Sequence, residues 1–127
     1  MWNTYQVRTW EIVLPLTKPL NLNHREHWAV KAKKVKQVRE WTALLARHAK
    51  VPPLRKITVE LHYCPRDKRR RDPLNLVALL KPIEDGLVDA KVIPDDNPLY
   101  LEPMMPKIDE PDVKSTKRIY FYIREIE

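Results

Sequence analysis

The chain has 127 residues, 43% of them hydrophobic, and its 24 lysines and arginines outnumber 17 acidic residues for a formal net charge of +7. The length predicts one domain over residues 1–127. The positive net charge either suits a nucleic-acid partner or serves solubility alone. One cysteine excludes a disulfide or cysteine-rich zinc site, and one glycine excludes glycine-rich nucleotide-cofactor loops. With no apolar run near the ~20 residues of a membrane span and no signal peptide, we expect a cytoplasmic protein.

The first part of the chain predicts a strand followed by a long helix. Residues 5–16 mix β-branched and aromatic side chains, which is typical of a strand. Asn23 and Glu26 resemble a capping pair for a helix over about residues 24–48. The expected core-facing stripe of this helix is Val35, Val38, Trp41 and Leu45, with Trp28 also expected in the core. Its other face is basic, with Lys31, Lys33, Lys34, Lys36, Arg39 and Arg47.

The middle of the chain predicts a half-buried strand and a second helix. Residues 55–65 alternate apolar and polar side chains, with Ile57, Val59, Leu61 and Tyr63 facing the core. After a basic loop at 66–71, a helix is expected over 72–90, capped by Asp72 and kinked or loosened at Pro82. Its expected buried stripe is Leu76, Leu80, Ile83 and Leu87.

The last part predicts a turn-rich loop at 91–98 and two strands, over 99–108 and 115–127. The resulting order is β-α-β-α-β-β. The fold class is therefore α+β, with a mixed sheet packed by two helices.

Three aspartates flank the second helix. Asp72 precedes it, and Asp95 and Asp96 follow it. Carboxylates converging from two loops suit a hard cation such as Mg²⁺, which also takes water and phosphate oxygens. Neighbouring arginines would position a phosphodiester. The alternative is that Asp72 only caps the helix and residues 94–98 form an ordinary turn.

The outer face of the second helix carries its own pattern. At 100° per residue, Leu74, Ala78, Lys81 and Asp85 cluster opposite the buried stripe. Lys81 and Asp85 are four residues apart and can form an ion pair. Lys81 either belongs to a simple surface pair or lies beside a scissile phosphate.

Residues 23–36 form a basic segment with His24 and His27. A metal site at these histidines is disfavoured because no third ligand accompanies them. The segment either contacts a DNA backbone or presents a solvated helix face.

Residues 69–97 resemble the RusA family of Holliday junction resolvases. The matching features are the run RRRD at 69–72, Asn75, Lys81, the sequence DGL at 85–87, and Asp95 with Asp96. The segment LNLNHREHWAVKAK is also similar to phage-type members. The resemblance implies a homodimer of α+β fold that cuts branched DNA, especially four-way junctions, by paired nicks.

The resemblance also implies roles for individual residues. Asp72, Asp95 and Asp96 would bind Mg²⁺ or Mn²⁺, and Lys81, after one extra helical turn, would stabilise developing charge. DNA contacts would come from Arg69, Arg70, Arg71, Asn75, Lys31, Lys33 and Lys34. Two positions depart from the family: Leu74 replaces the second aspartate of D-x-D-N, and Lys91 stands where glycine is common.

Leu74 separates three hypotheses. The first is an active metal-dependent endonuclease that works with Asp72, Asp95 and Asp96, with Asp85 or a residue of a dimer mate as a candidate replacement for the missing acid. The second is a junction-binding protein without nuclease activity, and the third is an interaction protein with Leu74 at a partner contact. Only the first two predict DNA binding that weakens steeply with salt.

Overall fold

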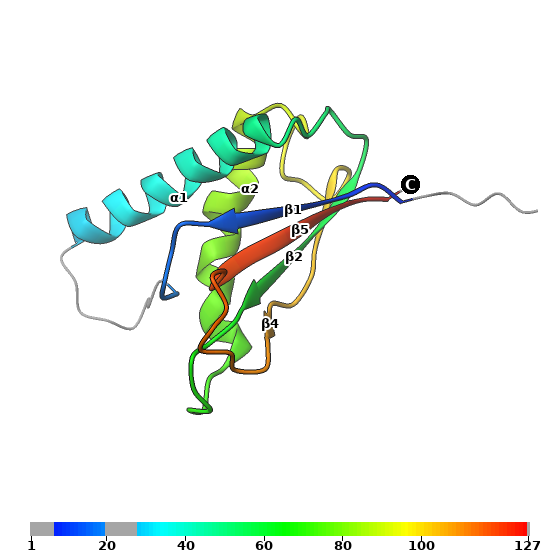
Figure 1. Cartoon of the computed structure of the whole chain (residues 1–127). Helices are drawn as coiled ribbons and strands as arrows, with labels where there is room; N and C mark the ends of the chain where they lie inside the picture. Colours follow the sequence, from blue (N-terminus) through cyan, green and yellow to red (C-terminus); the bar gives the residue numbers. More distant parts are fainter. Residues whose placement is uncertain (1–6, 20–27, 127) are drawn as a thin grey trace, which may run out of the picture.

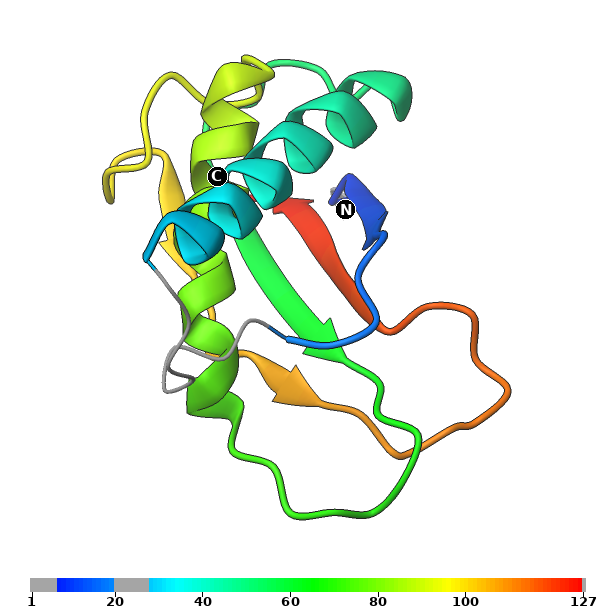
Figure 2. The same ribbon diagram turned by 90° about the vertical axis from the view of Figure 1, so that its left-hand side faces the viewer.

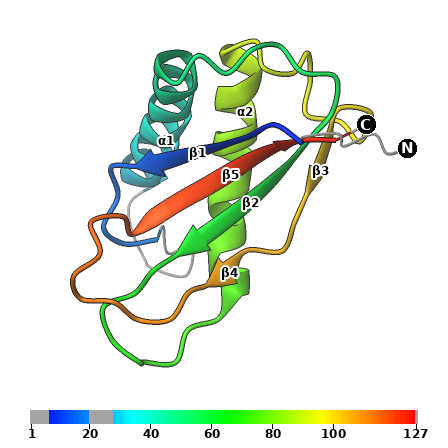
Figure 3. The same ribbon diagram turned by 45° about the vertical axis from the view of Figure 1, so that its right-hand side comes forward.

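A computed structural model describes residues 7–19 and 28–126. Two helices pack against one face of a five-stranded mixed sheet, which confirms the expected α+β class (Figures 1 and 3). The elements are β1 Thr9–Leu14, α1 Trp28–His48, β2 Ile57–Tyr63, the 3₁₀ helix η1 Pro73–Leu79, α2 Leu80–Asp89, β3 Leu101–Pro103, β4 Lys107–Ile108 and β5 Ile119–Glu125.

The sheet has the order β1-β5-β2-β3, and β4 pairs with β2 on the same edge as β3. β5 is antiparallel to both β1 and β2, whereas β3 and β4 are parallel to β2. The single strand predicted over 99–108 is therefore wrong in its extent. Pro103 and Pro106 lack an N–H for the ladder, which explains why the segment pairs only as two short strands.

The expected alternation of β2 is confirmed. Ile57, Val59 and Leu61 are fully buried, and Tyr63 packs against the core at the end of the strand. β5 contributes Ile119, Phe121 and Ile123 from the same face of the sheet. These side chains and the buried faces of the two helices form the hydrophobic core.

α1 packs only through its second half. Val38 is buried as predicted, but Val35 and Trp28 are exposed, and the other buried positions are Thr42, Ala43 and Ala46. The first turns of α1 extend past α2 (Figure 1). The predicted apolar stripe therefore begins before the part of α1 that packs against the rest of the fold. The capping pair and the start of the predicted helix lie outside the described residues.

No helix in the described part of the chain is long and apolar enough to cross a membrane.

The second helix begins as a 3₁₀ helix and continues as α2. Asp72 is the N-cap: its side chain accepts a hydrogen bond from the Leu74 N–H at 3.0 Å. Pro82 has no N–H for the carbonyl of Ala78, and its ring crowds that carbonyl in an α-helix. The tighter 3₁₀ spacing before α2 avoids this conflict. Leu79 is fully buried in this arrangement, whereas Leu80, which was predicted to belong to the buried stripe, is only half-buried.

Gly86 sets the distance between α1 and α2, which cross in Figure 2. A Cβ atom at this position would lie 2.6 Å from the Arg39 carbonyl oxygen and 2.6 Å from the Thr42 Cβ. Real side chains do not reach such distances, so only glycine permits this crossing. The Arg39 guanidinium also donates to both Asp89 carboxylate oxygens, at 2.6 and 2.8 Å, and holds the two helices together beside the crossing.

α2 ends in a Schellman motif. The Val92 N–H donates to the Leu87 carbonyl at 3.0 Å, and the Lys91 N–H donates to the Val88 carbonyl at 2.9 Å. Lys91 therefore adopts a left-handed conformation, with φ 62°. Glycine suits this position better than lysine because a Cβ is strained there.

The Lys91→Gly variant is expected to raise the free energy of unfolding by about 1 kcal/mol, because it removes the left-handed strain. As a control, Lys36→Gly within the exposed part of α1 should lower it by about 1 kcal/mol. Urea unfolding monitored by circular dichroism measures both values. Destabilisation by Lys91→Gly to the same extent as Lys36→Gly would contradict the assigned helix end.

Candidate active site

The clearest cluster of charges lies at the start of α2. The Lys81 ammonium donates to Asp96 and lies 3.1 Å from the Asp85 carboxylate. The hydrogen bond with Asp96, followed by that with Asp85, raises the pKa of Lys81. The same bond from Lys81 lowers the pKa of Asp96. The ammonium and this carboxylate are therefore both charged at neutral pH.

The loop after α2 gives its two aspartates different roles. Asp95 accepts hydrogen bonds from the Asp96 N–H at 2.8 Å and from the Asn97 side chain at 3.0 Å. Both Asp95 oxygens are thus used inside the turn. Asp96 instead reaches Lys81. Asp95 shapes the loop, and Asp96 brings the loop to α2.

Asp72 lies at the other end of the helical segment. The rise from Asp72 to Lys81 is roughly 17 Å along seven 3₁₀ and two α residues. The described residues contain no group of three or more histidine, cysteine or acidic side chains that could hold a metal ion. The structure therefore brings Lys81 and Asp96 together, but it does not gather Asp72, Asp95 and Asp96 into one group.

Asp85 and Asp96 are two carboxylates that lie against the same side chain, that of Lys81. Both contact the same ammonium, that of Lys81, so a positive charge already lies between them. Two carboxylates completed by water and phosphate oxygens match the ligands that Mg²⁺ prefers. Asp85, rather than Asp72, is therefore the second carboxylate that lies beside Lys81 and Asp96.

Leu74 lies on the exposed face that leads to Lys81. Its exposed fraction is 60%, and that of Val77 is 42%. Residues three apart share a face in a 3₁₀ helix, so Leu74 and Val77 form an exposed apolar line, and Lys81 follows four residues after Val77 at the start of α2. Sequence reasoning placed Ala78 on this face because it assumed 100° per residue, but Ala78 is half-buried.

The three arginines before Asp72 differ in their surroundings. Arg71 donates to the Asp67 carbonyl and carboxylate, both at 2.8 Å, and to the Arg69 carbonyl at 2.9 Å. Arg71 therefore connects parts of the basic loop to one another through its guanidinium. The side chain of Arg69 is 83% exposed, and Arg70 is also exposed. On α1, Lys33 and Lys34 are exposed and Lys31 is half-buried.

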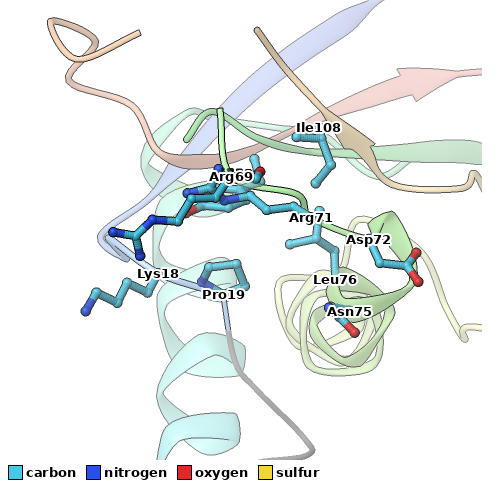
Figure 4. Close-up of a pocket in the computed structure, with 9 residues that line it drawn as sticks. Lys18, Pro19, Arg69, Arg71, Asp72, Asn75, Leu76 and Ile108 are labelled. Carbon is cyan, nitrogen blue, oxygen red and sulfur yellow. Dashed lines mark hydrogen bonds between the residues drawn. The ribbon is translucent and has the colours of Figure 1, made fainter. Parts of the chain in front are cut away.

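A pocket of about 400 Å³ opens beside this loop (Figure 4). We call it the Arg71 pocket, and its lining residues are Lys18, Pro19, Tyr63, Arg69, Arg71, Asp72, Asn75, Leu76 and Ile108. Figure 4 shows the ends of Lys18 and Arg69 on one side and the Asp72 carboxylate on the opposite side. Sequence reasoning missed Lys18, Tyr63 and Ile108 because they come from distant parts of the chain.

A second polar cluster lies on the sheet face opposite the helices. Glu60, only 5% exposed, contacts Lys107 at 3.0 Å and His62 at 2.9 Å and accepts from Arg124. Burial alone would raise the pKa of Glu60, but the hydrogen bonds from Lys107, Arg124 and His62 outweigh it and lower the pKa to about 2. His62 also contacts Asp109 at 2.7 Å. These contacts join β2, β4 and β5 and have a structural role.

Comparison with known proteins leaves the family open. No family model matches the chain. A protein of Xylella fastidiosa (strain Temecula1), whose name gives no function, is 32% identical over 84 residues, which cover 62% of this chain and 55% of that protein. The chain thus spans about half the length of this relative.

Glu84, next to Asp85, is the titratable group of this region with a pKa near neutrality. Burial is the largest cause, followed by the negative charge of Asp96, and together they raise its pKa to about 7. Its ordinary value is 4.5. The folded protein therefore retains a proton on Glu84 at pH values where the unfolded chain has released it.

We expect stability to fall as the pH rises from about 4.5 to 7, because a carboxyl whose pKa is raised by folding favours the folded state only while protonated. The Glu84→Gln variant removes this dependence. Its melting temperature should match that of the wild type at pH 4 and exceed it at pH 8. Glu110 is exposed, and the Glu110→Gln variant is the control. If the melting temperature of Glu84→Gln changes between pH 4 and pH 8 as much as that of the wild type, the environment assigned to Glu84 is refuted.

Proposed function

We propose that this protein is a metal-dependent endonuclease of the RusA-like kind, which binds branched DNA and nicks it. The observation that carries the proposal is the Lys81 ammonium held by Asp85 and Asp96 at the start of α2. Carboxylates such as these can hold a divalent cation, and an ammonium beside them can stabilise charge that develops on a phosphodiester. The basic loop before Asp72 adds side chains suited to a phosphate backbone.

Asp85 and Asp96 would hold the Mg²⁺ or Mn²⁺ ion in this proposal. Such an ion, when bound, polarises a phosphate and lowers the pKa of water. Asp95 fixes the turn that carries Asp96. Lys81 remains protonated and stabilises the negative charge that develops on the phosphate. Asp72 contributes by capping the helix that carries Lys81.

The substrate side of the proposal rests on the basic residues. Exposed Arg69 and Arg70 contact the backbone near Asp72, and Lys33 and Lys34 offer a second strip on α1. Contacts of this kind make binding fall steeply with salt concentration. Paired nicks across a four-way junction require two sites, which a homodimer would supply.

A second candidate is a junction-binding protein without nuclease activity. The exposure of Leu74 favours it, because an apolar side chain at 60% exposure occupies the position of a motif acid. An aspartate there would project from the face that leads to Lys81. The two candidates share DNA binding and differ in cleavage.

The decisive experiment is cleavage of a labelled four-way junction in Mg²⁺ or Mn²⁺. We expect the wild type to nick the junction and Lys81→Met to reduce the rate by about 10²–10³-fold, because the charge that stabilises the reaction is lost while the aliphatic stem remains. Asp96→Asn should also impair cleavage but not junction binding. Glu110→Gln is the matched control for loss of an exposed acid and should cleave normally.

Leu74→Asp separates the two candidates. If the wild type binds but never nicks, and Leu74→Asp nicks, the protein is a binding protein with a lost active site. If neither form binds junctions at low salt, the DNA proposal fails, and an interaction role for the Leu74 and Val77 face takes its place.

A further inference from the structure

We propose that the Arg71 pocket binds a single nucleotide of DNA that has left the base stack. This inference rests on the proposed function and deepens it, because it assigns a feature of the substrate to a site separate from Lys81 and Asp96. The volume of about 400 Å³ lies within the usual range for small-molecule pockets, about 300–1,000 Å³. The pocket is an open hollow, so a bound nucleotide can remain part of a strand.

The floor of the pocket suits a base. Leu76 is buried there, Ile108 and Pro19 are half-buried, and all three present apolar surface. An extruded base leaves the stack only where other surfaces replace its neighbours. Apolar side chains on one side of the ring meet part of this requirement.

Arg71 supplies a flat surface for stacking. Its guanidinium lies 5.6 Å from the centre of the Tyr63 ring. Three hydrogen bonds to the carbonyls of Asp67 and Arg69 and to the Asp67 carboxylate fix its position. Nucleic-acid bases stack on guanidinium planes as they do on aromatic rings. The Arg71 guanidinium plane is therefore preorganised, and binding a ligand costs little side-chain entropy.

The polar rim suits the rest of a nucleotide. Lys18, Arg69 and Arg71 outnumber the acids at this site, Asp67 and Asp72, which favours an anionic ligand. The Asn75 side-chain amide has no hydrogen-bond partner among the described residues, and it offers both donors and an acceptor. We assign the phosphate to the side of Lys18 and Arg69 and the edge of the base to Asn75.

The pocket is distinct from the candidate cleavage centre. Asp72, at its edge, is separated from Lys81 by roughly 17 Å of helical rise. That length corresponds to about five steps of stacked DNA at 3.4 Å each. A nucleotide held in the pocket would thus fix the register of the strand relative to Lys81 without touching the reacting phosphate.

The test compares two DNA duplexes that differ only by one unpaired thymidine, with binding measured by fluorescence anisotropy without divalent cation. The wild type should bind the bulged duplex at least about tenfold more tightly, because its extra base is free to stack in the pocket. Arg71→Lys keeps the charge but removes the plane, and Asn75→Ala removes the amide. Both should reduce the preference below about threefold. Arg55→Lys makes the same chemical change at an exposed arginine outside the pocket and should retain the preference.

The outcomes separate the two proposals. Equal binding of both duplexes by the wild type, or full preference in both pocket variants, overturns the pocket inference and leaves the proposed function standing. Absence of binding to these duplexes and to a four-way junction at low salt overturns the proposed function as well. Binding of thymidine 5′-monophosphate without any DNA binding assigns the pocket to free nucleotides and contradicts the inference.

Discussion

Pro82 cannot donate a hydrogen bond to the carbonyl of Ala78, and the form of the whole segment between the basic loop and α2 depends on this missing bond. The chain enters as a 3₁₀ helix capped by Asp72 and becomes an α-helix only from Leu80. This change of spacing turns Leu79 into the core and leaves Leu74 and Val77 on the exposed line that leads to Lys81. Pro82 lies in the first turn of α2, the part of an α-helix that tolerates a proline.

The close crossing at Gly86 anchors the charges that surround Lys81. Because α1 touches α2 there, Arg39 reaches Asp89 and lies 4.0 Å from Asp85. Asp85 in turn contacts Lys81, and Lys81 contacts Asp96 from the following loop. A row of alternating charges therefore runs along α2 from the helix crossing to the candidate metal position. Packing at one glycine and electrostatics at the site are parts of one arrangement.

The sequence predicted what depends on local pattern. The alternation of β2, the Asp72 cap, the Lys81–Asp85 pair and the α+β class with two helices are all present in the structure. The prediction failed where tertiary context decides: Val35, in the expected stripe of α1, is exposed, and Pro103 and Pro106 divide one predicted strand. Asp95 and Asp96 look alike in sequence, and only the fold of their loop separates a turn residue from a Lys81 partner. The lining of the Arg71 pocket could not be predicted because it combines residues 18, 63 and 108 with the basic loop.

We propose that Asp85 and Asp96 bind a divalent cation beside Lys81. Anomalous diffraction from crystals grown with Mn²⁺ tests it most directly, because it locates the metal independently of any activity. We expect a manganese peak within coordination distance of carboxylate oxygens from Asp85 and Asp96, with the Lys81 ammonium displaced from between them. A peak at Asp72 with none at Asp85 and Asp96, or no manganese at any of these residues, would contradict it.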